Sequence, residues 1–252
     1  MECIWVHQKL FKLANSYKKK YKLKIGVVNF DPMPKMFFNR SLKNFRITSI
    51  SQKVDLLSKL KVDFIITKKF DKLFSKTKSI NFIKEILYKK LKSKFIFVSN
   101  NFRFGNNREG NVDLLIKNED KYNFKVVKPE PLIKQQKIIS STLIRGLLEK
   151  GYLEKANKLL NRKWTINGVV QKGRQVGKKI GFPTCNIDIK DYVLAKPGVY
   201  AVRVLVPNNS KYLKGIANLG YRPTFNQKKS YLRFIYSIIL EIFIINSYQW
   251  SL

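Results

Sequence analysis

The chain has 252 residues, which is enough for one large or two medium domains with their own hydrophobic cores. Apolar residues make up 44% of it, which excludes a disordered chain, and 51 Lys and Arg against 16 Asp and Glu give a formal net charge of +35. This charge suggests an anionic partner: nucleic acid, a membrane surface or phosphorylated small molecules. Because the charge is mostly lysine and is spread along the whole chain, biased codon usage explains it better than nucleic-acid binding does.

The cysteines and the histidine restrict the chemistry further. Cys3 and Cys185 are too far apart for a metal cluster or a disulfide framework, and they fit a reducing cytosol, so we expect a cytoplasmic protein. His7 is the only histidine, which excludes a His-rich metal site. The longest apolar stretch, residues 234–245, is too short to span a bilayer, and we expect neither a membrane nor a nucleic-acid partner.

Helices and short strands alternate through the first part of the chain. Apolar residues at helical spacing predict helices over residues 8–20, 51–60 and from Ser79 to about residue 87. Short β-branched apolar runs predict buried strands at residues 23–30, 62–67, 95–98 and 124–127. This alternation predicts an α/β domain with a parallel sheet and helices on its faces.

The pattern changes after residue 140. Helical spacing runs through Leu147, stops near Gly151 and resumes through Leu160. After Arg162 the chain becomes a series of short strand-like runs punctuated by glycine, at residues 164–170, 199–206 and 215–219. These runs predict a small β-barrel or sandwich, with a domain boundary near residue 161.

A cluster of hydroxyl residues and one arginine opens the first of these later helices. The segment IISSTLIRG contains Ser140, Ser141, Thr142 and Arg145 where the chain enters the helix. Hydroxyls and free backbone N–H groups at a helix N-terminus favour an anion. The segment therefore predicts a polyphosphate cradle; an ordinary N-cap with a surface arginine is the alternative interpretation.

A glycine-rich segment, GVVQKGRQVGKKIGFPTCNI, follows in the second domain. Gly173, Gly177 and Gly181 allow the backbone to approach a ligand closely. Thr184 and Asn186 are two residues apart in an extended segment, so their oxygens point the same way and can hold a hard cation together with phosphates. A glycine-rich hairpin without a ligand is the alternative.

Two weaker motifs follow predicted strands, FDPMP at residues 30–34 and NNFRFGNNREG at residues 100–110. Taken together and in this order, the segments resemble the bacterial bifunctional riboflavin kinase/FMN adenylyltransferase (FAD synthase) family. The resemblance covers nearly the whole chain to about residue 231. The segments ISSTLIR and GFPTCN at this separation are its most specific part.

The resemblance implies an α/β Rossmann-like nucleotidyltransferase domain at residues 1–160 and an all-β flavokinase barrel at residues 161–252. It implies a transferase of FMN and FAD biosynthesis, with kinase and nucleotidyltransferase activities. The enzyme would use ATP and Mg²⁺, with riboflavin, FMN and FAD as substrates and products. Flavins and ATP would be its partners.

The resemblance also assigns roles to residues. In the kinase, Thr184 and Asn186 would hold Mg²⁺ and ATP, the loop with Gly173, Gly177 and Gly181 would cover the phosphates, and a glutamate would accept the proton of the riboflavin 5′-hydroxyl. In the adenylyltransferase, His7 would end a catalytic HxGH motif. The ATP phosphates would be gripped by Ser140, Ser141, Thr142 and Arg145.

Both ends of the sequence depart from the family pattern. Residues 4–6 read Ile-Trp-Val, so the first histidine and the glycine of HxGH are absent, and no residues remain for the family's first strand, which belongs near the middle of the sheet. Arg233 stands where the kinase glutamate is expected, and we expect the strand around it to be out of register. We therefore expect ends that are missing or frameshifted, a kinase domain truncated or altered after about residue 231, and an incomplete barrel.

These departures leave two alternatives to an active enzyme. The first is a catalytically degenerate homologue that still binds flavin or nucleotide. The second is an unrelated basic RNA-binding protein, whose affinity would fall steeply with salt and which would bind no flavin.

Overall fold

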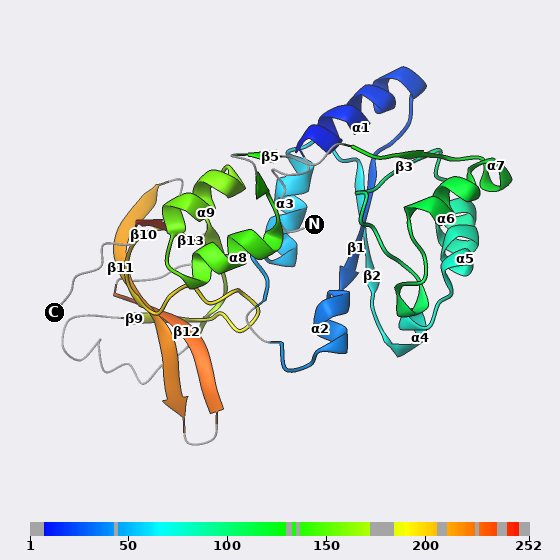
Figure 1. Ribbon diagram of the computed structural model, residues 1–252. Coiled ribbons are helices and arrows are strands. Elements are labelled where there is room, and N and C mark those ends of the chain that lie inside the picture. The colour runs from blue at the N-terminus through cyan, green and yellow to red at the C-terminus, as the bar shows by residue number, and fades with distance from the viewer. Residues whose placement is uncertain are drawn as a thin grey trace. The chain divides into compact units, whose positions relative to one another are not determined.

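The computed structural model describes residues 8–42, 45–129, 133–134, 137–171, 184–205, 211–224, 227–235 and 241–246. These residues form two compact units. The α/β unit comprises residues 8–39 and 60–138, and the β-rich unit comprises residues 40–59 and 139–246 (Figure 1). No helix among the described residues is long and apolar enough to cross a membrane.

The α/β unit follows the predicted alternation of helices and strands. Its strands are β1 (Gly26–Asp31), β2 (Phe64–Lys69), β3 (Phe95–Phe97), β4 (Lys125–Val127), β5 (Ile133–Lys134) and β6 (Lys137–Ile138). Its helices are α1 (Gln8–Tyr21), α2 (Pro34–Phe38), α4 (Lys72–Ser75), α5 (Ser79–Asn81), the π-helix η1 (Phe82–Lys90), the 3₁₀ turn η2 (Asn106–Arg108), α6 (Val112–Lys117) and α7 (Glu119–Tyr122). The predicted α/β class with parallel strands is confirmed.

The parallel strands form two separate pairs. β1 pairs with β2 from Gly26–Phe64 to Asp31–Lys69, and β3 pairs with β4 from Phe95–Lys125 to Phe97–Val127. No ladder between described strands joins the two pairs. The unit therefore presents two short parallel ribbons where the sequence predicts one sheet, and the absence of a first strand remains a prediction.

The core of the α/β unit packs η1 and α6 against β3. Ile83 on η1 and Leu115 on α6 are completely buried, and Ile96 supplies the inward face of β3. On the other side of the strand, Tyr17 of α1 makes an edge-on contact with Phe95, with ring centroids 4.8 Å apart. These contacts hold the β3–β4 ribbon between helices.

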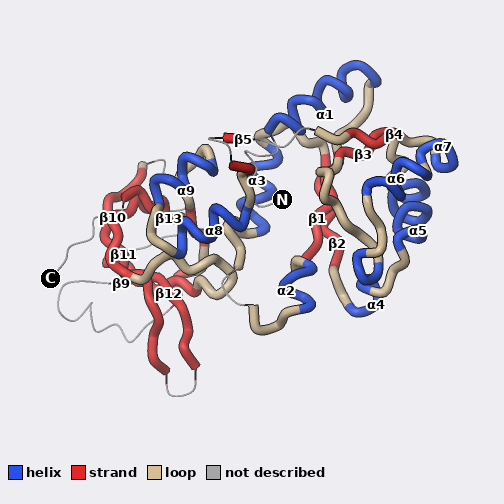
Figure 2. Tube along the Cα trace, in the orientation of Figure 1, coloured by secondary structure: helices blue, strands red, loops and turns tan. Residues whose placement is uncertain are grey.

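The β-rich unit is built on one antiparallel sheet. Its strands are β7 (Thr165–Asn167), β8 (Val170–Gln171), β9 (Thr184–Asp188), β10 (Gly198–Leu205), β11 (Tyr212–Thr224), β12 (Gln227–Ile235) and β13 (Glu241–Asn246). They lie in the order β7-β13-β10-β11-β12-β9-β8. Helices α3 (Ile50–Ser58), α8 (Ser141–Glu149) and α9 (Leu153–Leu160) complete the unit, in which α9 packs beside α8 and against β13 (Figure 2).

The strand that contains Arg233 is regular, which corrects one expectation. Residues 231–235 of β12 pair without interruption with β9, from Tyr231–Asp188 to Ile235–Thr184. On its other side β12 pairs with β11 over nine consecutive rungs. The expectation that this strand is out of register is therefore wrong: its neighbours on both sides fix its alignment.

Residues 40–59 are joined to the sheet by a buried amide. Gln52 donates to the carbonyl of Thr165 at 3.1 Å and to Oδ1 of Asn167 at 2.6 Å, and its Oε1 accepts from the Ser49 N–H at 2.9 Å and the Tyr192 hydroxyl at 3.2 Å. All four hydrogen-bonding positions of this buried side chain are thus used. Burial also raises the pKa of Tyr192, which keeps its hydroxyl protonated as a donor.

A second buried anchor lies beside the first. Trp164, which has no exposed surface, donates from Nε1 to the carbonyl of Ile47 at 3.0 Å. Arg46 forms a bridge with Tyr192, in which the Arg46 N–H donates to the Asp191 carbonyl at 2.8 Å. The sequence correctly predicts the helix at 51–60 but not these partners, which lie more than a hundred residues away along the chain.

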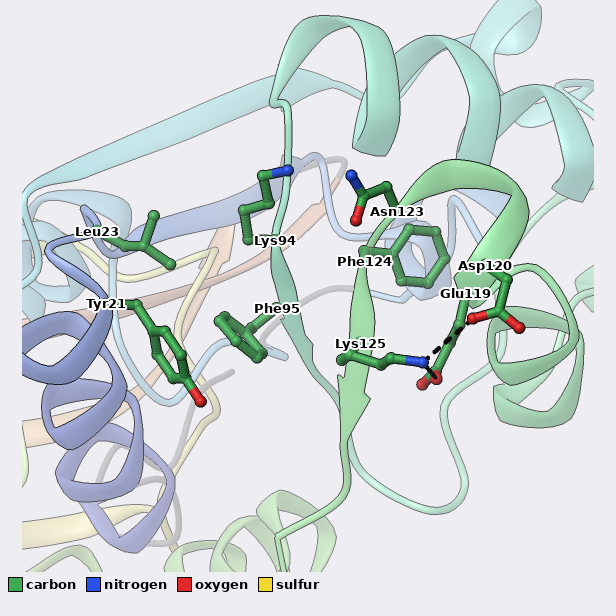
Figure 3. Close-up of a pocket in the computed structure, with 9 residues that line it drawn as sticks. All are labelled: Tyr21, Leu23, Lys94, Phe95, Glu119, Asp120, Asn123, Phe124 and Lys125. Carbon is green, nitrogen blue, oxygen red and sulfur yellow. Dashed lines mark hydrogen bonds and ion pairs between the residues drawn. The ribbon is translucent and has the colours of Figure 1, made fainter.

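A partly open cavity of about 500 Å³ lies at the amino-terminal ends of β3 and β4 (Figure 3). Ligands of open parallel sheets bind at the opposite, carboxyl-terminal edge, so this cavity is not the predicted nucleotide site. At its margin the Glu119 carboxylate accepts from the Val126 N–H at 2.7 Å and from Lys125 Nζ at 3.0 Å. The backbone bond to Val126, followed by the bond to Lys125, lowers the pKa of Glu119 below its ordinary value of 4.5.

The lowered pKa of Glu119 predicts a specific pH dependence of stability. The unfolded chain binds this proton more readily than the folded chain, so the stabilisation is fully present above about pH 4.5 and is lost as the pH falls through the folded pKa. Glu119→Gln should therefore reduce the urea midpoint at pH 7 and reduce it less at pH 3.5. Glu154→Gln, at an exposed position, is the control. An equal deficit at both pH values would contradict the prediction.

Candidate functional site

The first candidate site is the amino-terminal end of α8. Ser140 has the extended backbone of an N-cap, with φ −135° and ψ 158°, and its Oγ accepts from the Leu143 N–H at 3.2 Å. Ile144 and Leu148 are completely buried and hold the helix against the rest of the unit. The predicted entry into a helix at Ser140 is confirmed, and the hydroxyl of Ser140 serves as its cap.

Arg145 lies one turn into the same helix. Residues Ser141 and Arg145 are four positions apart, so they share one helix face, and side chains of a helix lean toward its N-terminus. The Arg145 Nε donates to the carbonyl of Phe45 at 2.9 Å, and its Cζ lies 3.7 Å from the centroid of the Phe45 ring. Thr142 is exposed, whereas Ser141 and Arg145 are half-buried. The structure thus brings the four predicted residues of this segment together on one turn and a half of helix.

The sequence does not single out Phe45. Its partner lies a hundred positions further along the chain, and the residues around it form no motif and no periodic pattern. Phe45 is itself buried, with 8% of its surface exposed. A contact between a loop and a helix so far apart in sequence is settled only by the tertiary fold.

The second candidate site is a row of polar residues across the sheet. Thr184 and Asn186 lie on β9, two positions apart as predicted. Asn186 is paired with Gln171 of β8 on one side and with Arg233 of β12 on the other, and Arg233 is paired with Asn218 of β11. Residues directly opposite one another in an antiparallel ladder share a face of the sheet. Four adjacent strands therefore place four polar residues in one row.

The row lies on the less buried face of the sheet. Gln171 and Asn218 are exposed and Asn186 is half-buried, whereas Ile187 and Leu219, which belong to the opposite face, are buried. The position at which the resemblance expects a glutamate, now Arg233, is thus a direct neighbour of Asn186. An arginine thus stands at this position of β12 in place of the expected glutamate.

The donor set on β9 can hold a hard cation only with help from a ligand. The described residues contain no group of three His, Cys, Asp or Glu side chains that could bind a metal ion. Asp188 adds a carboxylate on the face of Asn186, although its Oδ1 accepts from the Lys190 N–H at 2.9 Å. Neutral side-chain oxygens near one carboxylate fit Mg²⁺ when phosphate oxygens supply the remaining ligands.

Four of the predicted site residues lie outside the described part of the chain. They are His7, Gly173, Gly177 and Gly181. Their roles in the HxGH motif and in the loop over the phosphates remain predictions.

Comparisons with known proteins identify what the chain is similar to. A family model described as FAD synthetase matches residues 6–143, and one described as riboflavin kinase matches residues 160–251. Two proteins named bifunctional riboflavin kinase/FMN adenylyltransferase come from Buchnera aphidicola. The protein from subsp. Schizaphis graminum is 40% identical over 89% of this chain and 72% of its own length, and that from subsp. Acyrthosiphon pisum is 39% identical over 96% and 77%.

A further relative and a solved structure are also similar to this chain. The protein of the same name from Escherichia coli (strain K12) is 35% identical over 86% of this chain and 69% of its own length. A crystal structure titled macrolide-efflux protein, from Streptococcus pneumoniae, superposes with a TM-score of 0.77 over 97% of this chain and 83% of that one. At 22% identity this likeness concerns the fold alone.

The cap of α8 allows a direct test of the local geometry. Ser140→Ala removes the acceptor for the Leu143 N–H and should lower the free energy of unfolding by about 1 kcal/mol. Thr142→Ala, two residues further on at an exposed position, is the matched control and should change it by less than about 0.5 kcal/mol. Urea unfolding followed by tryptophan fluorescence measures both. Equal effects would show that Ser140 does not cap the helix.

Proposed function

Since the chain belongs to the bifunctional riboflavin kinase/FMN adenylyltransferase family, we propose that it phosphorylates riboflavin to FMN and adenylylates FMN to FAD at two separate sites. Both activities are those of the family, which uses ATP together with riboflavin or FMN as substrates. We assign adenylyl transfer to residues 1–160 and phosphoryl transfer to residues 161–252. We place both reactions in the cytoplasm, where the thiol of Cys185, which is in no disulfide, remains reduced.

In the adenylyltransferase reaction, a phosphate oxygen of FMN attacks the α-phosphorus of ATP and pyrophosphate leaves. The reaction builds negative charge on the leaving group. The N–H groups at the start of α8 and the Arg145 guanidinium are donors suited to that charge. Ser141 and Thr142 add hydroxyls at the same end of the helix. His7 would assist from the HxGH position.

In the kinase reaction, the riboflavin 5′-hydroxyl attacks the γ-phosphorus of ATP and must lose a proton. Thr184 and Asn186 would hold Mg²⁺ together with the ATP phosphates, and the bound ion would neutralise phosphate charge. An arginine stays protonated at any physiological pH, so Arg233 cannot accept the proton of the hydroxyl. We therefore expect this chain to bind the kinase substrates and to transfer the phosphoryl group slowly.

We propose that the sheet of the β-rich unit closes into a barrel, and the positions of its two end strands along the chain support this. The strands at the two ends of the sheet order, β7 and β8, are consecutive in the chain and are separated only by Gly168 and Val169. A Cβ atom on Gly168 would collide with Cγ2 of Ile187 on β9. A glycine at this corner lets the chain cross closely from one end of the sheet to the other.

The kinase proposal rests on the pairing of residue 233 on β12 with Asn186 on β9. Because of this pairing, Arg233→Glu should place a carboxylate where the riboflavin hydroxyl loses its proton. The variant should form FMN roughly 10- to 100-fold faster, because a general base contributes at least that much. The full chain is incubated with riboflavin, ATP and Mg²⁺, and riboflavin, FMN and FAD are separated and quantified.

Arg203→Glu is the matched control, since it makes the same charge change at an exposed position on β10. It should leave the rate unchanged. Faster FMN formation in both variants would show that the change in net charge, and not the pairing of residue 233 with Asn186, causes the gain. A parent chain that binds riboflavin and ATP but forms neither product, with no gain in Arg233→Glu, would favour a degenerate binding protein. A chain that binds neither compound would refute the proposed function.

A further inference from the structure

The contact between Phe45 and Arg145 combines two interactions on one guanidinium group. The Phe45 ring lies under the face of the group, with 3.7 Å between its centroid and Cζ. The carbonyl of the same residue accepts from Nε at 2.9 Å. One residue therefore fixes both the plane of the guanidinium group and its rotation within that plane.

This arrangement keeps the end of the group suited to an anion. The N–H donors of a guanidinium lie in its plane, so stacking on an aromatic ring uses none of them. The Nε atom carries one of the five donors, and the other four are on the two terminal nitrogens, whose fork geometry suits the paired oxygens of a phosphate. Arg145 is half-buried rather than buried, so part of it remains accessible.

The support for this contact is rigid. Phe45 is buried and is followed directly by Arg46, whose backbone is bridged to Tyr192, and by Ile47, whose carbonyl accepts from Trp164. A long arginine side chain loses rotamer freedom when it grips a ligand. A side chain already held by Phe45 has lost much of that freedom before the ligand arrives.

We propose that Phe45 is a positioning residue for the adenylyltransferase site, which holds the Arg145 guanidinium in the orientation that grips the ATP phosphates. The proposal rests on the proposed function of α8. Phe45 acts through Arg145 and touches no substrate itself. Its effect should therefore appear in ATP affinity only while Arg145 is present.

The test is a double-mutant cycle read out as ATP affinity. ATP is titrated in the presence of Mg²⁺ into the full chain by calorimetry, and the binding component weakened by Arg145→Ala identifies the α8 site. Phe45→Leu should weaken that component roughly 3- to 30-fold, the range for a desolvated cation–π contact. Phe45→Tyr keeps the ring and should stay within about twofold of the parent. In the Arg145→Ala background, Phe45→Leu should have no further effect.

Two controls separate positioning from a general loss of stability. Phe124→Leu removes another buried ring, from the α/β unit, and should leave ATP affinity unchanged. If Phe45→Leu does not fold, Arg145→Lys serves in its place, because lysine keeps the charge but loses the planar stack and the Nε bond; it should weaken binding to a similar extent.

The outcomes distinguish the inference from the function on which it rests. Equal losses in Phe45→Leu and Phe45→Tyr, or an undiminished effect of Phe45→Leu in the Arg145→Ala background, would overturn the positioning role alone. Unchanged ATP affinity in Arg145→Ala would overturn the assignment of ATP phosphates to α8, and the positioning role with it.

Discussion

The structure of the β-rich unit depends on the buried amide of Gln52. A buried polar group that loses its partners is costly, and this side chain has four partners supplied by Ser49, Thr165, Asn167 and Tyr192. The bonds to Thr165, Asn167 and Tyr192 attach α3 to residues outside its own segment. The indole of Trp164 repeats the constraint a few residues away, at the carbonyl of Ile47. Residues 40–59 are therefore fixed to the sheet by groups that leave little freedom of position.

These bonds attach residues 40–59 to the β-rich unit. Residues 40–59 fall within the part of the chain matched by the FAD synthetase model, yet they pack with the unit that contains β9 and β12. The same unit contains α8, so it carries both proposed phosphate-binding sites. Because Phe45 belongs to the anchored segment, the orientation of Arg145 is linked to the packing of the sheet.

Local patterns in the sequence predict local structure well and distant contacts poorly. The helix at residues 51–60, the cap at Ser140 and the spacing of Thr184 and Asn186 follow from periodicity and residue chemistry, and the structure contains them. The division of the parallel strands into two ribbons and the contact of Phe45 depend on partners far along the chain, which periodicity does not encode. The error about the strand at Arg233 has the same origin, since two neighbouring strands fix its register.

Residues 40–59 fold with the β-rich unit, and hydrogen exchange of the full chain in increasing urea tests this most directly. The amides of α3 should open together with those of β10 and β11, at the same urea dependence, because the buried bonds of Gln52 break only when the sheet does. Opening of α3 together with β1 and β2, while β10 and β11 stay protected, would contradict the account.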